Sequence, residues 1–414
     1  MRTRLLAVLA TVFLLAACGG GAEEPDEVGW RTDGVQAASG PAGFGDAVAV
    51  VDGATTDLKV IVLDAATGQP RFSKAWTPSA RYGAVGVGRP ALFEDVVVGM
   101  QPAGFQTALA GWDAATGKEL WKVEVAETFG PFPCGDLVCS EDNWSLPSAA
   151  LVARDPATGD TRWSSPGSQT YVYATREVLV EQDLNQPVLR SIDPSNGQDR
   201  WRTDLRTSLG PEAAPVVTEA QLVEGTLVVE SNTGPNAPNG TVGLDPATGA
   251  VRWNHPGFGL CPQPTPDVLL VCSTRSGLQR LNPATGEALW TTERFRPPSQ
   301  AGPLAGVTAD LETMVGSDAD AKPVAIDLET GEVSEPPAGL TFTRFSSNEQ
   351  AKKGPDTPAG QYLGPLDPVP WDFKASRPVQ LTDADDLPEF LGLSLAGMRI
   401  FLDVSGNLRA LPAG

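Results

Sequence analysis

Short apolar runs recur along most of the chain, and each is bounded by residues that favour turns. Examples are DAVAVVDG (46–53), DVVVGM (95–100), GTLVVES (225–231) and DVLLVCS (267–273). Runs of this length, rich in β-branched residues, are typical of strands. After the first twenty residues, no long apolar pattern has the 3.6-residue period of a helix. The pattern therefore predicts an all-β fold.

A ten-residue string recurs between these runs. Six copies are RDPATGDTRW (154–163), LDAATGQPRF (63–72), WDAATGKELW (112–121), IDPSNGQDRW (192–201), LDPATGAVRW (244–253) and LNPATGEALW (281–290), and a divergent seventh is IDLETGEVSE (326–335). The second position of each copy is Asp64, Asp113, Asp155, Asp193, Asp245, Asn282 or Asp327. These positions are about 44 residues apart on average. That period matches a four-stranded propeller blade.

Each copy predicts a tight turn between two antiparallel strands. The Asp or Asn side chain can accept hydrogen bonds from backbone N–H groups two or three residues later, so these residues are assigned to turns rather than to catalysis. Gly supplies the left-handed conformation that closes the hairpin. The strand after Gly carries an aromatic residue, which is Phe72, Trp121, Trp163, Trp201, Trp253 or Trp290.

The two ends of the repeated region complement one another. MRIFLDVSGNLRAL (398–411) resembles the middle strands of a blade, whereas GWRTD (29–33) resembles the outer strand in RWRTDL (200–205). We therefore expect the N-terminal strand with Trp30 to complete the C-terminal blade, which removes free sheet edges. Counting outer strands, with one near Val333, gives an eight-bladed β-propeller. A seven-bladed ring is the alternative if one copy is not a full blade.

Residues 345–386 interrupt the period and are rich in Pro and polar residues. An excursion of this length is usually functional or disordered, and we predict a loop inserted before the last blade. Trp371 within it, and Trp144 in SEDNWSLP, lie outside the repeat position. Each is a candidate either for partner contact or for packing over a blade edge.

The N-terminal segment has the features of an export signal. Arg2 and Arg4 precede an apolar run over 5–15, which is shorter than the roughly 20 residues that span a bilayer. LAAC (15–18) resembles the bacterial lipobox, which implies removal of 1–17 and lipidation of Cys18; a plain secretory signal is the alternative. Several acyl chains give stable membrane anchoring. Residues 18–27 are predicted to form a flexible acidic tether, and 28–414 the propeller.

Four cysteines remain after Cys18, an even number in a chain with an export signal. They occur in two similar settings, PCGDLVCS (133–140) and LCPQPTPDVLLVCS (260–273). In both, one Cys precedes a strand and the other lies near its end. We predict the disulfides Cys134–Cys139 and Cys261–Cys272, with free buried thiols as the alternative.

The formal net charge is −21, and Lys352–Lys353 is the one adjacent pair of basic residues after the signal. Nucleic acid is therefore not an expected partner. The single histidine, His255, precedes a Pro–Gly turn, which predicts a loop position with no visible catalytic partner. The acidic clusters 318–320 and 383–386 lack the pattern of an EF-hand loop, so we expect no metal site.

The motif Asp-x-x-Thr-Gly-x-x-x-Trp at this period resembles the pyrroloquinoline-quinone-like (PQQ-like) propeller repeat, over almost all of 28–414. The resemblance implies that the aromatics, Trp30 included, dock between neighbouring blades. One branch of the family consists of dehydrogenases that use the quinone with calcium or a lanthanide, and many of them carry adjacent cysteines. The other consists of non-catalytic lipoproteins, similar in architecture to BamB, a scaffold of the outer-membrane β-barrel assembly machine.

The lipobox, the acidic tether and the absence of adjacent cysteines favour the second branch. We expect a monomeric, non-catalytic lipoprotein on the extracytoplasmic side of the bacterial envelope, where it serves as a scaffold or binding module for protein partners. No catalytic, cofactor-binding or metal residues are assigned. The alternatives are a PQQ- and calcium-dependent dehydrogenase and a receptor that binds a small ligand in the central funnel.

Overall fold

The structure is a computed structural model, and the statements below concern the residues that it describes. These are 29–32, 35, 37, 39, 41–53, 58–77, 79–81, 84–86, 89–103, 106–125, 128–143, 149–166, 170–174, 177–183, 187–209, 216–232, 240–260, 268–273, 277–295, 306–307, 312–318, 320, 322–336, 341–344, 370–372, 377–378, 393–402 and 408–412. Cys18 and the segments 1–17 and 18–27 therefore lie outside the described residues.

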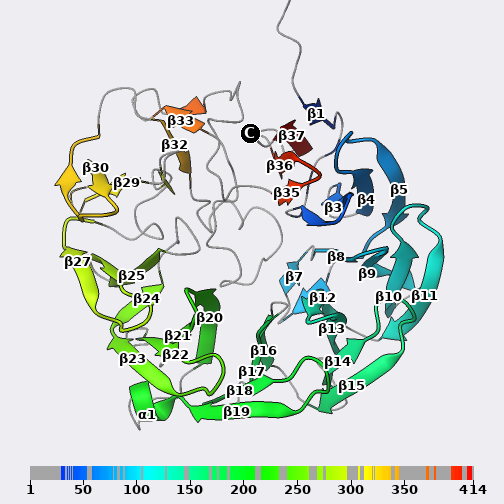
Figure 1. The fold of residues 1–414 in the computed structure, drawn as a ribbon, viewed down its shortest axis with the longest axis horizontal. Coiled ribbons are helices and arrows are strands. Elements are labelled where there is room, and N and C mark those ends of the chain that lie inside the picture. Colours follow the sequence, from blue (N-terminus) through cyan, green and yellow to red (C-terminus); the bar gives the residue numbers. More distant parts are fainter. Residues whose placement is uncertain are drawn as a thin grey trace, which may run out of the picture.

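Antiparallel sheets stand around a common axis as the blades of a propeller (Figure 1). In the described part of the chain, seven sheets have four strands, and one sheet has seven strands, four of which form a blade. In blades 2 to 6 the first strand lies nearest the axis and the last lies at the rim (Figure 1). The prediction of an eight-bladed β-propeller is confirmed, and the seven-bladed alternative is wrong.

The blades follow the chain in order. Blade 1 comprises β2 (Ala42–Phe44), β3 (Ala47–Asp52), β4 (Lys59–Asp64) and β5 (Pro70–Ala75), and blade 2 comprises β8 (Ala91–Phe93), β9 (Val96–Ala103), β10 (Gln106–Asp113) and β11 (Glu119–Val125). Blade 3 comprises β12 (Thr128–Cys134), β13 (Leu137–Asp142), β14 (Ala150–Arg154) and β15 (Thr161–Pro166), and blade 4 comprises β16 (Thr170–Ala174), β17 (Leu179–Asp183), β18 (Val188–Ile192) and β19 (Asp199–Asp204). Blade 5 comprises β20 (Val216–Val223), β21 (Thr226–Asn232), β22 (Gly240–Leu244) and β23 (Val251–Pro256), and blade 6 comprises β24 (Phe258–Leu260), β25 (Leu269–Ser273), β26 (Leu278–Leu281) and β27 (Ala288–Thr292). Blade 7 comprises β28 (Gly306–Val307), β29 (Thr313–Ser317), β30 (Pro323–Asp327) and β31 (Val333–Ser334), and blade 8 comprises β35 (Leu393–Leu395), β36 (Met398–Leu402), β37 (Leu408–Pro412) and β1 (Trp30–Arg31).

Two small elements lie between blades. The hairpin of β6 (Ser79–Arg81) and β7 (Ala84–Gly86) connects blades 1 and 2, and the single-turn helix α1 (Arg206–Leu209) follows blade 4. Within the described residues, no helix has the length and apolar character needed to cross a membrane.

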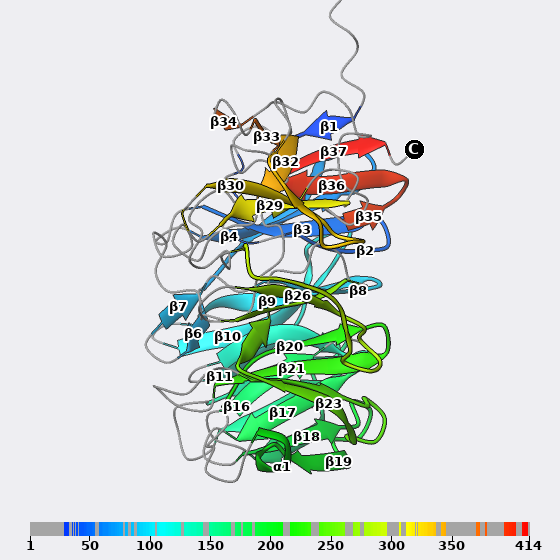
Figure 2. The same ribbon diagram turned by 90° about the vertical axis from the view of Figure 1, so that its left-hand side faces the viewer.

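The N-terminal strand closes the ring. β1 pairs antiparallel with β37, with Trp30 opposite Ala410 and Arg31 opposite Arg409. The Thr32 amide donates to the carbonyl of Leu408 at 2.9 Å, which continues the ladder by one residue. Figure 2 shows β1 beside β37 and β36, at the edge of the eighth blade. The predicted closure by residues almost 380 positions apart is therefore present in the structure.

The core lies between the blades. The second strand of a blade is covered on both faces, so β3 is apolar at five successive buried positions. The outer strand is covered on one face only, and in β15 buried Trp163 and Ser165 alternate with exposed residues. Buried side chains from neighbouring blades form shared apolar clusters, as Trp201 of blade 4 does with Leu227 and Val242 of blade 5. Such burial, at about 25 cal/mol per Å² of apolar surface, is the main force that holds the blades together.

The segment predicted as an inserted loop contributes strands to the seventh blade. β32 (Thr341–Arg344) pairs with β28, the first strand of that blade, and β33 (Pro370–Asp372) and β34 (Arg377–Pro378) continue the sheet beyond β32, on the side away from β31. The described parts of 345–386 are therefore strand rather than loop. As the first strand of its blade, β28 has an edge of backbone N–H and C=O groups that no other strand of that blade pairs. β32 pairs with this edge, and β33 and β34 each pair in turn with the edge of the strand before them.

Candidate functional site

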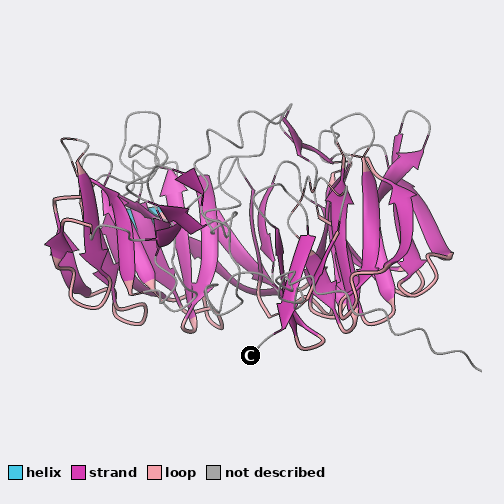
Figure 3. Cartoon of the chain, turned by 90° about the horizontal axis from the view of Figure 1, so that it is seen from above, coloured by secondary structure: helices cyan, strands magenta, loops and turns pink. Residues whose placement is uncertain are grey.

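The repeated motif forms a contact between neighbouring blades. The short turns of the blades lie along one face of the ring (Figure 3). The indole N–H of the motif tryptophan in one blade donates a hydrogen bond to the turn of the next blade. The acceptor is the backbone carbonyl of the residue that follows the turn Asp or Asn. The bonds run from Trp30 to Ala65 at 3.0 Å, Trp121 to Pro156 at 2.7 Å, Trp163 to Pro194 at 2.7 Å, Trp201 to Pro246 at 2.9 Å, Trp253 to Pro283 at 2.8 Å and Trp290 to Leu328 at 2.9 Å.

The turn glycine makes room for the aromatic ring of the preceding blade. Gly159 has φ +75°, and a Cβ atom built there would lie 2.6 Å from the ring of Trp121. At Gly117 the same Cβ atom would meet Phe72 at 2.5 Å. The glycine is therefore required twice, first for its left-handed backbone and second for the stacked ring. We call the aromatic residue, the carbonyl and the glycine together the interblade lock.

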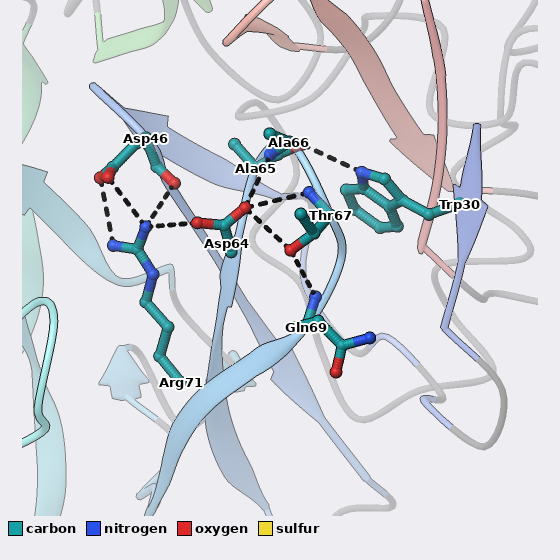
Figure 4. Close-up of polar contacts among 8 residues, drawn as sticks. All are labelled: Trp30, Asp46, Asp64, Ala65, Ala66, Thr67, Gln69 and Arg71. Carbon is teal, nitrogen blue, oxygen red and sulfur yellow. Dashed lines mark hydrogen bonds and ion pairs between the residues drawn. The ribbon is translucent and has the colours of Figure 1, made fainter. Parts of the chain in front are cut away.

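The repeated Asp side chains are bound within their own turns, as Figure 4 shows for Asp64. Its Oδ1 accepts from the amides of Ala66 at 3.1 Å and Thr67 at 3.0 Å, and its Oδ2 accepts from Arg71 at 2.8 Å. Arg71 also contacts Asp46. The Arg71 hydrogen bond is the largest cause that lowers the pKa of Asp64. A carboxylate held this firmly in its charged form is poorly suited to accept a catalytic proton.

The equivalent positions follow the same pattern. Backbone amides two or three residues later donate to the side-chain oxygen of Asp113, Asp155, Asp193, Asp245, Asn282 and Asp327. An arginine seven residues later pairs with the Asp in blades 3, 4 and 5, through Arg162, Arg200 and Arg252. In blades 2 and 6 that position is occupied by Leu120 and Leu289, which are 42% and 55% exposed.

Buried polar side chains form a second set of contacts, some within a blade and some between blades. Arg154 of β14 forms an ion pair with Asp142 of β13 and donates to Ser140 at 2.9 Å. All three side chains are buried. Burying such charges is tolerated because each is paired and hydrogen-bonded.

A second ionic group lies between blades 3 and 4. Glu181 of β17 is 2% exposed and accepts from Arg190 of β18 at 2.9 Å. Arg190 also binds Ser165 of blade 3 and contacts Asp199 at 3.3 Å. Burial is the largest cause that raises the pKa of Glu181 to about 7, and the charge of Glu141 adds to the increase.

Polar residues occupy one repeated position in three consecutive blades. In each of these blades, one residue of the second strand lies level with the motif tryptophan, two strands away across the sheet. The residue two positions further along that second strand is Glu141 in blade 3, Gln182 in blade 4 and Glu230 in blade 5. Gln182 Oε1 accepts from the amide of Val217 at 2.7 Å, and Glu230 Oε2 accepts from the amide of Leu260 at 2.8 Å. These bonds join each blade to the innermost strand of the next.

The predicted disulfides and the two tryptophans outside the repeat lie only partly within the described residues. Cys134 and Cys139 form the predicted disulfide, across the β12–β13 turn. Cys261 and the side chain of Cys272 lie outside the described residues, as does Trp144. Trp371 lies in β33, opposite Phe342 of β32, and its side chain is not described.

His255 lies in β23, and the prediction of a loop position was wrong because the outer strand runs past the motif tryptophan. Its Nε2 lies 2.6 Å from the carbonyl of Gly286 in the next blade. Thr203, two residues after Trp201 as His255 is after Trp253, donates to the Gly249 carbonyl at 2.6 Å. The histidine therefore reinforces an interblade lock.

The described residues provide no donor set for a metal. Among them, no group of three or more His, Cys, Asp or Glu side chains is arranged to hold an ion. In the first acidic cluster, Asp318 Oδ1 accepts from the amides of Asp320 and Lys322, both at 2.9 Å. The second cluster, 383–386, lies outside the described residues.

The fold and the interblade locks define an eight-bladed propeller of PQQ-like repeats. The model of one family, outer membrane protein assembly factor BamB, matches residues 22–170, 104–260 and 185–336. The chain belongs to this family. No curated protein sequence matches it significantly.

Three solved structures illustrate the range of similar folds. BamB from Moraxella catarrhalis is 16% identical, with 76% of this chain and 88% of that chain covered and a TM-score of 0.44. The computationally designed Ika8 protein is 15% identical, with 92% and 98% covered and a TM-score of 0.47. A europium-containing methanol dehydrogenase is 13% identical, with 69% and 72% covered and a TM-score of 0.41. Likenesses this distant do not transfer an activity.

Proposed function

We propose that this protein is a lipid-anchored, extracytoplasmic propeller that acts as a non-catalytic scaffold or binding module for envelope proteins. The observation that carries the proposal is the family match over residues 22–336, since that family is described by a role in outer membrane protein assembly. The commitment of the repeated Asp and Trp side chains to turns and locks adds support.

Lipidation of Cys18 is tested by fractionation of cells that express the wild-type chain or Cys18→Ala. We expect the wild-type protein to enter the detergent phase of a Triton X-114 extraction and to carry a labelled fatty acid. The Cys18→Ala variant should carry none and should keep the unprocessed mass. Equal labelling of both would contradict an anchor at this residue. Cys134→Ala with Cys139→Ala is the matched control, because it removes thiols elsewhere.

The scaffold role is tested by crosslinking in intact cells, followed by purification and mass spectrometry. We expect a reproducible set of envelope proteins with the anchored chain, and loss of part of that set when residues 345–386 are replaced by a short Gly–Ser linker. Circular dichroism and a thermal melt of the purified variant show whether the ring is retained. An unchanged set would remove the inserted segment from the binding surface.

The two alternatives predict different results with the purified protein. A dehydrogenase would bind PQQ stoichiometrically in the presence of calcium and would oxidise an alcohol or sugar with dye reduction. A small-ligand receptor would show a raised melting temperature with one compound class, because a ligand that binds the native state stabilises it. Stoichiometric quinone binding with turnover would overturn the scaffold proposal.

A further inference from the structure

The turn of blade 4 differs from every other copy of the motif at one position. The residue before the turn glycine is Asn196 there and Thr in the other six copies. The Asn196 side chain caps the turn, since its Oδ1 accepts from the amide of Gln198 at 2.9 Å. In the other copies the threonine hydroxyl accepts from the equivalent amide at 3.2–3.4 Å. The turn of blade 4 therefore keeps the hydrogen bond but changes the chemistry of the side chain.

Asn196 and Gly197 form one of two Asn–Gly pairs in the sequence, the other being Asn239–Gly240. In such a pair the backbone nitrogen of the glycine can attack the side-chain carbon Cγ of the asparagine, because glycine has no Cβ atom to shield it. A bond forms between that nitrogen and Cγ, the bond from Cγ to Nδ2 breaks, and ammonia leaves with the proton of the backbone amide. Water then opens the resulting succinimide to aspartate or isoaspartate. Asn196 is exposed, so water reaches it.

The interblade lock restrains this reaction. The Gly197 amide donates to the carbonyl of Asp193 at 2.8 Å, so the attacking nitrogen is held within the turn. Closure of the succinimide ring rotates the peptide group between Asn196 and Gly197, which breaks that bond. The preceding blade opposes the rotation, because the indole N–H of Trp163 donates to the carbonyl of Pro194 at 2.7 Å. A Cβ atom built at Gly197 would lie 2.8 Å from the Trp163 ring, so the glycine has little space in which to move.

We propose that Asn196 is a site of spontaneous deamidation, and that the lock between blades 3 and 4 controls its rate. The reaction starts from the minor population in which the lock is open. Because deamidation is much slower than opening and closing, its rate follows that population. Isoaspartate at this position adds one methylene group to the backbone before Gly197, and this displaces the glycine from beneath Trp163. A reversible opening of two blades then becomes a permanent one.

The test is incubation of the purified full-length protein at mildly alkaline pH, followed by peptide mapping with mass spectrometry. Asn196 should deamidate readily in guanidinium chloride and much more slowly in the native protein. Trp163→Phe keeps a ring, as Phe72 does in blade 1, but loses the indole hydrogen bond, and it should raise the native rate about fivefold. Equal rates in the native and denatured chains, or in native wild type and Trp163→Phe, would overturn the proposal.

Two further variants separate the lock from a general loss of stability. Trp253→Phe makes the same change in the lock between blades 5 and 6, and it should leave the rate at Asn196 unchanged. Asn196→Thr restores the residue of the other copies and should abolish the product at this turn. Asn239, which lies outside the described residues, is an internal reference within each sample. An equal rise at Asn196 with Trp253→Phe, or at Asn239 with Trp163→Phe, would contradict control by the lock. These outcomes do not depend on the proposed function or on any partner protein.

Discussion

The interface between blades 3 and 4 and the interface between blades 7 and 8 join equivalent sheets by different means. At the first, Trp163 stacks on Gly197 and donates to Pro194, and its ring belongs to an apolar cluster shared by both blades. At the second, the aromatic position of blade 7 is exposed Glu335. Among the described residues, no buried apolar cluster joins blades 7 and 8.

The difference shows that the motif is a joining device and that each copy serves the interface on either side of it. The turn of blade 7 is intact and receives Trp290, so Gly331 and Leu328 are kept although the aromatic residue that should follow is lost. Blade 8 has no such turn, because its third and fourth strands, β37 and β1, come from opposite ends of the chain. With no turn to receive it, an aromatic residue at position 335 would have no partner.

The largest effect should come from truncating a lock, as in Trp163→Ala. The side chain is 8% exposed and packs between two blades, so its loss should cost about 3–5 kcal/mol of unfolding free energy. Urea denaturation followed by circular dichroism measures the change. Leu289→Ala, at a side chain 55% exposed, is the control and should cost less than about 0.5 kcal/mol. Similar costs for the two variants would show that the lock does not hold the blades.

A smaller loss is expected from adding a methyl group under a ring. Gly159→Ala and Gly397→Ala share the same backbone, with φ +75° and +74°, but the new Cβ meets Trp121 at 2.6 Å in the first and nothing within 4 Å in the second. Both substitutions should lower the unfolding free energy by about 1 kcal/mol, because a residue with a Cβ atom is strained in the left-handed region. Gly159→Ala should cost about 1–3 kcal/mol more through overpacking. The difference between the two unfolding free energies is the measurement, and equal costs would contradict the role of the ring.

The turns could be predicted from the sequence because they are local and repeated, and the docking of the aromatic residues between blades was implied by the family resemblance. Each turn is set by residues within ten positions, and seven copies reveal its period. The pairing of Glu181 with Arg190 depends on strand register, which a single blade does not reveal. Alignment of the second strands, LVCSED, LVEQD and TLVVESN, would have shown polar residues interrupting apolar runs. The strands β33 and β34 lack any alternating pattern, because PWD and RP are too short to carry one.

The charged part of the turn should contribute less than the lock. Asp155→Asn keeps the oxygen that caps the turn, as Asn282 does in blade 6, but it loses the ion pair with Arg162. The hydrogen bond from Arg162 is the main cause that lowers the pKa of Asp155. Arg162 is 56% exposed in its side chain, so the loss at pH 7 should be about 0.2–1 kcal/mol.

The pH dependence of that loss distinguishes charge from shape. A lowered native pKa contributes stability that is present above the unfolded value of 3.8 and is lost as the pH falls through the native value. The stabilities of wild type and Asp155→Asn, measured by urea denaturation from pH 7 to pH 2.5, should therefore converge at the acidic end. A gap that persisted there would assign the effect to the geometry of the turn.

The smallest effect should come from restoring the missing aromatic residue, as in Glu335→Trp. The new ring would extend from blade 7 toward a blade with neither the carbonyl nor the glycine of a lock, so it would remain at the surface. We expect a change in unfolding free energy below about 0.5 kcal/mol. Phe72→Trp, at an interface whose receiving turn includes Gly117, is the matched control and offers the new indole N–H a carbonyl at the position used in six other locks. A gain from Glu335→Trp equal to that from Phe72→Trp would show that an aromatic residue alone joins two blades and that the receiving turn is dispensable.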